Sequence, residues 1–206
     1  MRIWLTRKQP ETTSSDGKPN ATEGWLQPES SQTLLAVSSR QQLIQFIRQS
    51  TALPASLFER FWLIPLHRFA ELAQLFPASE NHHHAYAGGL LDHSLEAACY
   101  AARLRQSYLF TPDAAPEDQA AQSERWTTVI IYDALLHDLG KLITDIEVED
   151  TSGQRWFPWH GPLTQPYRFR YLPQRDYLRH PAAEALLLTQ LLPPENLDTL
   201  AADSAA

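Results

Sequence analysis

Large apolar side chains recur along this chain at three- and four-residue spacing, which is the period of an amphipathic helix. The pattern holds through residues 34–47 and again through 58–76, with Pro54 and Pro65 interrupting it. Because proline ends or kinks a helix, we predict two helices broken around these residues, with Pro77 closing the block. Residues 90–104 contain no glycine or proline and are rich in helix formers, so they predict a further helix of about four turns.

The second half of the chain predicts two more helices and a small β element. A loop is expected around 112–118, followed by a more buried helix over 125–139 that ends at Gly140 in a left-handed C-cap. Residues 146–148 and 155–157 flank Thr-Ser-Gly and predict a hairpin, and 181–192 predicts the last helix. The fold class expected is therefore all-α, a mainly helical bundle with a small β-hairpin or irregular insertion around 146–175.

Domain organisation follows from where large apolar residues are sparse. Residues 9–33 are rich in Pro, Ser, Thr and Gly, which is typical of a flexible segment. We expect a flexible N-terminal arm over 1–33, one helical domain over 34–195 and a flexible C-terminal tail over 196–206.

Composition narrows the class of protein. The 206 residues are 43% hydrophobic and include one cysteine, Cys99, which excludes an intrachain disulfide and a cysteine-rich zinc cage. No apolar run reaches the roughly 20 residues that span a bilayer, and residues 1–30 lack the apolar stretch of a signal peptide. We therefore expect a soluble, cytoplasmic protein without membrane insertion.

The net charge of −7 argues at first against a nucleic-acid partner. The charge is unevenly distributed, however. Residues 113–150 carry ten acidic residues against two basic ones, whereas 155–180 carry five arginines against one aspartate. The second segment is interleaved with aromatic residues, a composition that fits a platform for single-stranded nucleic acid or a surface loop anchored by its rings.

Histidine provides the candidate chemistry. Three histidines occupy 82–84, His93 follows, and His137 adjoins Asp138. Imidazole and carboxylate ligands without thiolates favour Mn, Fe, Ni or Mg. Neighbouring residues on a helix diverge by about 100°, so His137 and Asp138 can face one metal only if the helix ends there. Gly140 supplies that ending.

Three motifs together resemble the HD-domain metal-dependent phosphohydrolase superfamily: 88–98 (GGLLDHSLEAA), 135–141 (LLHDLGK) and 180–187 (HPAAEALL). The resemblance implies that His93, His137 and Asp138 bind a divalent metal and that His180 is a candidate ligand of a second one. It also implies that Lys141 lies beside the pair to receive phosphate. The superfamily adds a distal Asp on a later helix, for which the candidates are Asp198, Asp203, Asp145 and Asp133.

A longer set of segments resembles the TraI-like HD domain of MobH-class conjugative relaxases over roughly 34–195. The segments are 82–96, 116–119, 125–126, 137–145 and 153–163. This likeness implies processing of DNA at a transfer origin with a three-histidine motif and the HD pair. Residues 83–96 also resemble the HD domain of YhaM-type 3′–5′ exoribonucleases.

The triple histidine is expected in a loop or helix entrance, because three adjacent residues on a helix would point three ways. His83 and His84 are candidate catalytic residues, as orienting groups, phosphate donors or a general acid, and His82 is a candidate substrate-binding residue. Solvent-exposed or structural histidines remain the alternative. The arginines expected to bind substrate are Arg155, Arg168 and Arg170.

The function expected is a metal-dependent phosphodiesterase or phosphohydrolase acting on nucleic acid, most simply single-stranded DNA, with one or two divalent ions and relaxase-like DNA processing in conjugation. A phosphohydrolase for nucleotides is one alternative. A catalytically degenerate scaffold that binds proteins of the conjugation machinery is another. Turnover of oligonucleotides against mononucleotides, and metal analysis, distinguish the three.

Overall fold

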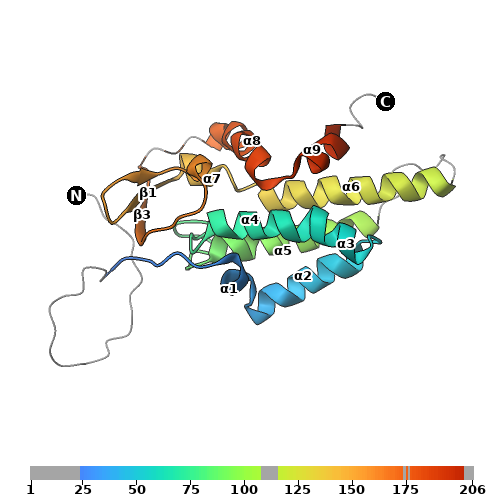
Figure 1. Ribbon diagram of the computed structural model, residues 1–206, viewed down its shortest axis with the longest axis horizontal. Coiled ribbons are helices and arrows are strands. Elements are labelled where there is room, and N and C mark those ends of the chain that lie inside the picture. Colours follow the sequence, from blue (N-terminus) through green and yellow to red (C-terminus); the bar gives the residue numbers. More distant parts are fainter. Residues whose placement is uncertain (1–23, 108–115, 174, 176, 202–206) are drawn as a thin grey trace.

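The computed structural model describes residues 24–107, 116–173, 175 and 177–201, which form a mainly helical body with a three-stranded antiparallel sheet at one end (Figure 1). The helical elements of the first half are α1 (Ser31–Leu35), α2 (Ser38–Ser50), α3 (Ala55–Phe58), the π-helical turn η1 (Glu59–Leu63), α4 (Ile64–Ala73) and α5 (Gly89–Gln106). The second half contains α6 (Pro116–Leu136), α7 (Lys141–Thr144), β1 (Ile146–Asp150), β2 (Arg155–Trp156), η2 (Pro158–His160), β3 (Tyr167–Tyr171), η3 (Tyr177–Arg179), α8 (His180–Leu191) and α9 (Pro194–Ala201). The mainly helical class with a small β insertion is confirmed.

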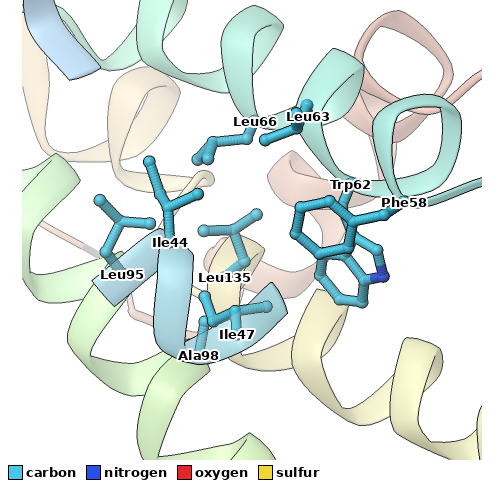
Figure 2. A pocket seen from close by; sticks show the side chains of 9 residues that line it. All are labelled: Ile44, Ile47, Phe58, Trp62, Leu63, Leu66, Leu95, Ala98 and Leu135. Carbon is cyan, nitrogen blue, oxygen red and sulfur yellow. The ribbon is translucent and has the colours of Figure 1, made fainter. Parts of the chain in front are cut away.

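Helix α5 is central, because α6 and α2 both pack along it. It buries a face of small and branched side chains at helical spacing: Leu91, Leu95, Ala98 and Ala102. A cavity of about 10 Å³ lies where α2, α3, η1, α4, α5 and α6 meet, and apolar and aromatic side chains line it (Figure 2). A space of that size without polar partners stays dry, so this part of the core is packing and not a binding site.

Pro65 does not break the helix in which it lies, contrary to the sequence prediction. The chain remains helical from α3 through η1 to α4. Proline cannot donate a hydrogen bond to the carbonyl four residues earlier, here that of Phe61. That carbonyl instead accepts the hydroxyl of Tyr132 and, at 3.4 Å, the side-chain amide of Asn196. Contacts from α6 and α9 thus replace the helix bond that Pro65 removes.

The packed part of the chain begins earlier than residue 34. Leu26 is buried and forms a two-way backbone bridge with Tyr167 of β3, with N–O distances of 2.8 and 2.9 Å. Helix α1 follows within the predicted arm, capped by the Ser30 hydroxyl, which accepts from the Thr33 amide. Residues 1–23 of the predicted arm lie outside the described residues.

The predicted C-terminal tail also contains packed structure. Helix α9 extends to Ala201, and Asn196 is buried, donating to the Tyr132 hydroxyl at 2.6 Å. Residues 202–206 lie outside the described part. Among the described residues, no helix is both long and apolar enough to cross a membrane.

The structure differs from the predicted 125–139 helix at both of its ends. Helix α6 already begins at Pro116, within the expected loop, of which 112–115 lie outside the described residues. It ends at Leu136, and Gly140 is right-handed with φ −59°, so the predicted left-handed cap is wrong. A Cβ at Gly140 would lie 2.4 Å from the His180 carbonyl oxygen. The glycine is needed because the start of α8 approaches it.

The predicted hairpin is confirmed as β1 and β2, with Val148 opposite Trp156. The sequence prediction missed β3, which pairs along the other edge of β1 to give the order β2-β1-β3. Buried side chains alternate with partly buried ones along β1 and β3. Phe76 packs against this sheet and contacts the rings of Phe169 and Tyr167 edge-on.

Candidate metal centre

The loop before α5 carries the triple histidine and lies tightly against the start of that helix. A Cβ at Gly89 would come within 2.0 Å of the His84 carbonyl oxygen, so only glycine allows this approach. Gly88 has φ +81°, a conformation that glycine adopts without strain. The paired glycines therefore determine where His83 and His84 lie relative to His93.

A buried arginine fixes the same junction. Arg40 of α2 donates to the Asp92 carboxylate at 2.6 Å, to the Leu34 carbonyl at 2.6 Å and to the Gly88 carbonyl at 3.2 Å. Its side chain is 7% exposed, so its charge is compensated by Asp92 in a largely dry environment. Asp92 directly precedes His93, and the arginine thereby holds the first turn of α5.

His93, His137 and Asp138 come together where α5 passes the end of α6. His93 Nε2 lies 3.2 Å from His137 Nε2 and 3.4 Å from Asp138 Oδ2, and the His137 Nε2 to Asp138 Oδ2 distance is 3.6 Å. Two ligand atoms about 2.1 Å from one ion, at angles of 90–110°, are about 3.0–3.4 Å apart. The three residues therefore fit a divalent cation, and they are one of the groups whose donor atoms converge closely enough to hold one.

The hydrogen bonds of His137 support this fit. Its Nδ1 lies 2.8 Å from the Ala134 carbonyl oxygen, which can only accept, so Nδ1 carries the proton. In the neutral ring, Nε2 then presents its lone pair to His93 and Asp138. A backbone carbonyl that fixes the tautomer in this way is typical of metal-binding histidines.

Burial lowers the pKa of His93, and the nearby His137, His84 and Lys141 lower it further, while Asp138 opposes the shift. The ring is accordingly neutral at pH 7. Neutral imidazole is the form that binds a metal.

Lys141 contacts the HD pair directly. Its Nζ donates to Asp138 Oδ2 at 2.6 Å and to the Ala78 carbonyl at 2.9 Å. Asp138 is buried, so the ammonium neutralises a carboxylate that would otherwise be costly to desolvate. The oxygen held by Lys141 is the same one that faces the two histidines.

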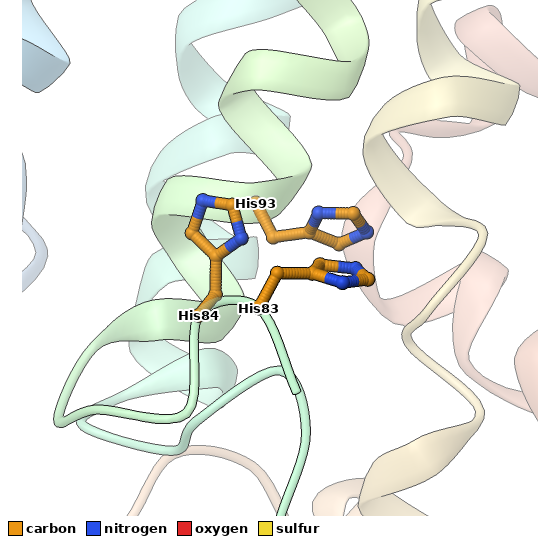
Figure 3. A group of neighbouring side chains, drawn as sticks. All are labelled: His83, His84 and His93. Atoms are coloured by element: carbon orange, nitrogen blue, oxygen red, sulfur yellow. The ribbon is translucent and has the colours of Figure 1, made fainter. Parts of the chain in front are cut away.

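His83 and His84, from the loop before α5, lie beside His93 (Figure 3). The ring centroids of both lie 5.2 Å from that of His93, and the three residues form a second converging donor group. His82 is exposed, and its described hydrogen bond is a backbone one, from its amide to the Ser79 hydroxyl. It belongs to neither of the two groups found among the described residues.

His180 lies at the start of α8 and pairs with Asp145, at 2.7 Å between Nε2 and Oδ1. Neither residue belongs to the two converging groups of the described part. Of the other distal candidates, Asp198 is exposed on α9, Asp133 is exposed on α6, and Asp203 lies outside the described residues.

The three candidate arginines lie on the sheet. Arg168 and Arg170 of β3 form cross-strand ion pairs with Glu149 and Glu147 of β1. Arg155 of β2 lies 4.6 Å above the Phe157 ring, and the exposed Trp159 stacks on that ring at 4.6 Å with an 8° interplanar angle.

Sequence reasoning missed Glu184 on α8, one turn beyond His180. Burial raises the pKa of its carboxyl, and the charges of Asp133 and Asp138 raise it further, while His137 lowers it. The available signal was its place on the predicted helix 181–192, four residues after the candidate ligand His180. The lone cysteine is not a ligand candidate, because burial raises the pKa of Cys99 to about 11 and its thiol contacts the Leu43 carbonyl.

Comparison with known proteins agrees with a DNA-processing context. A search of curated proteins found no match. The family model TraI_2, described as "putative helicase", matches residues 24–205, which include both histidine groups, the sheet and α8. Because this match extends over most of the chain, the protein belongs to the TraI_2 family.

Proposed function

We propose that this chain is an HD-type, metal-dependent phosphodiesterase domain that acts on nucleic acid in relaxase-like DNA processing. The observation that carries the proposal is the convergence of His93, His137 and Asp138 with spacings that fit one divalent cation. The TraI_2 match supplies the DNA context. Neither Gly-Lys pair of the chain lies in a GxxxxGK[S/T] loop, so the proposal rests on the histidine site and not on a nucleotide-driven motor.

The chain's own residues prepare the site for a phosphate. A divalent cation held by His93, His137 and Asp138 would act as a Lewis acid, lowering the pKa of water and polarising a phosphodiester oxygen. His137 is oriented by the Ala134 carbonyl, and Asp138 is held by a hydrogen bond from the Lys141 ammonium. Lys141 can turn its ammonium to a phosphate oxygen when a cation takes over the charge of Asp138.

The substrate surface extends over the sheet. Trp159 is 43% exposed and stacked on Phe157, so its free edge or face can accept a base, and Arg155 beside it can contact the backbone. Arg168 and Arg170 already face glutamates, so phosphate would have to compete with Glu149 and Glu147 for them. We therefore assign Arg155 the larger share of substrate binding.

Cleavage of a labelled single-stranded oligonucleotide by the purified chain, loaded with Mn²⁺, tests the proposal. We expect activity that EDTA abolishes and that the double variant His137→Ala/Asp138→Asn lacks. Tyr100→Phe changes a side chain that is 69% exposed and lies outside both histidine groups, so it should retain activity. Full activity in the double variant would overturn the proposal. Turnover of mononucleotides but not oligonucleotides would assign the site to small phosphorylated substrates.

A further inference from the structure

The triple-histidine loop and α5 bring three imidazoles together beside the HD pair. One donor atom from each of His83, His84 and His93 lies within 4.8 Å of the others. The centroids of the His83 and His84 rings are 5.7 Å apart, and each is 5.2 Å from that of His93 (Figure 3). Such spacings fit three nitrogens on one face of an ion and leave its other positions open.

His84 has the hydrogen bonding of a metal ligand. Its Nε2 lies 3.1 Å from Glu96 Oε2, one turn along α5 from His93, so the carboxylate accepts the Nε2 proton. In the neutral ring, Nδ1 then carries a lone pair. This atom is buried and has no hydrogen-bond partner among the described residues. A buried acceptor without a partner is unfavourable, and a cation bound to it would remove that penalty.

The backbone holds this ring in place at an energetic cost. His84 has φ +57°, a left-handed conformation that non-glycine residues adopt infrequently. Its carbonyl is pressed against Gly89, and its carbonyl oxygen also accepts from the Ala78 amide at 3.1 Å. Strain kept in this way is typical of residues whose side chain is aimed at a ligand.

We propose that His83, His84 and His93 form a second divalent-cation site and that Glu96 positions His84 for it. Three imidazole nitrogens favour borderline first-row ions such as Co²⁺, Ni²⁺ or Zn²⁺ over Mg²⁺ or Ca²⁺. His93 belongs to both groups, and one lone pair serves one ion, so the two groups compete for its Nε2 when that nitrogen is the donor. This inference builds on the proposed function, because it gives the proposed centre two alternative sets of metal ligands. The three-histidine site can nevertheless exist whether or not the chain cleaves nucleic acid.

Binding of Co²⁺ in the His137→Ala/Asp138→Asn background tests the site with His93 left to the three-histidine group. We expect one Co²⁺ per chain by isothermal titration, with a visible absorption spectrum typical of nitrogen ligands. Adding His84→Ala should weaken the affinity at least tenfold. Adding His82→Ala removes a neighbouring imidazole that belongs to neither group, so it should not change the affinity. Circular dichroism confirms that each variant is folded.

Glu96 is tested by a pair of substitutions in the same background. Glu96→Ala should weaken Co²⁺ binding by about 10–100-fold, as loss of such supporting carboxylates does. Glu96→Gln should recover part of the affinity, because its amide oxygen can still accept from Nε2. Equal affinity in all three proteins would remove Glu96 from the proposal.

Nuclear magnetic resonance provides an independent measurement in the same His137→Ala/Asp138→Asn background. With ¹⁵N-labelled histidine, Zn²⁺ should shift the Nδ1 resonance of His84 while Nε2 keeps its proton. An unshifted Nδ1, or a background variant that binds Co²⁺ no more tightly than its His84→Ala derivative, would overturn the site. Neither measurement depends on cleavage, so a failure of the phosphodiesterase assay would contradict the proposed function and not the three-histidine site.

Discussion

Replacement of Gly140 by alanine tests how the turn carrying the HD pair is built. The new Cβ would lie 2.4 Å from the His180 carbonyl oxygen and 3.0 Å from both the His180 carbonyl carbon and Cα. All three atoms belong to the backbone, so no side chain can rotate away. The start of α8 would have to move by about 1 Å to restore ordinary van der Waals contact.

Two opposing terms set the magnitude. Overpacking of this kind costs about 1–3 kcal/mol. Gly140 is right-handed, with φ −59° and ψ −25°, so alanine also gains about 0.4–1 kcal/mol by restricting the unfolded chain. The net loss is about 1–2 kcal/mol, which for a domain of this size lowers Tm by about 2–8 °C.

Thermal unfolding, monitored by circular dichroism, measures the change in Tm. A second substitution, Gly140→Asn, makes the test specific for the backbone conformation. If Gly140 were left-handed, Gly140→Asn would be tolerated better than Gly140→Ala. With a right-handed backbone and a close neighbour, asparagine should be no better. Gly153 is the matched control, since it has φ +80° and open space around it, and there asparagine should be better than alanine. An unchanged Tm in Gly140→Ala, or the Gly153 ranking at Gly140, would refute the reasoning.

Three further changes have defined outcomes. Tyr132→Phe removes the hydroxyl donated to the Phe61 carbonyl and should lower the free energy of unfolding in urea by about 1–3 kcal/mol. Lys141→Met removes the ammonium 2.6 Å from Asp138 Oδ2, so calorimetry should show Mn²⁺ binding roughly fivefold tighter, as expected for about 1 kcal/mol of repulsion. The metal-free Lys141→Met protein should be less stable. The pKa of Glu184 is raised in the folded chain, so its ionised form opposes folding. Glu184→Gln should therefore raise the Tm of the metal-free protein at pH 8. The difference in Tm should vanish as the pH falls below about 4.5, where the carboxyl is protonated in both the folded and the unfolded chain.

Each of these has a control or an opposing result. Tyr100 is 69% exposed, so Tyr100→Phe should leave the unfolding free energy unchanged. Weaker Mn²⁺ binding in Lys141→Met would mean that the ammonium supports the cation site and does not compete with it. A Tm difference for Glu184→Gln that persists at pH 4 would mean that packing and not charge is responsible.

The parts of the fold predicted from sequence are those specified locally. Helix α5 follows from an uninterrupted run of helix formers, and the hairpin follows from two apolar runs around a turn. The convergence of His93 with His137 and Asp138 was expected from motif resemblance, and the structure places them 3.2–3.6 Å apart. His93 lies near the start of α5, and His137 and Asp138 directly follow the end of α6, so the motifs mark the two helix ends that meet.

The missed features depend on contacts distant in sequence. The helix continues through Pro65 because Tyr132 and Asn196, far along the chain, satisfy the Phe61 carbonyl. Strand β3 forms because it pairs with β1 and because its Phe169 packs on Phe76. The arginines of β3 were predicted from composition as substrate-binding residues, whereas the register places them opposite glutamates. No local pattern contains that pairing information.

Two separate backbone approaches position the two donor groups that share His93. On one side, Gly89 allows the His84 backbone to lie against the helix. On the other, Gly140 allows α8 to lie against the turn that follows His137 and Asp138. A substitution at either glycine displaces ligands without altering any of them. Gly89→Ala should therefore weaken cation binding at the three-histidine group more than at the HD pair, and Gly140→Ala should do the reverse. That result would mean that the backbone beside each group determines where its ligands lie.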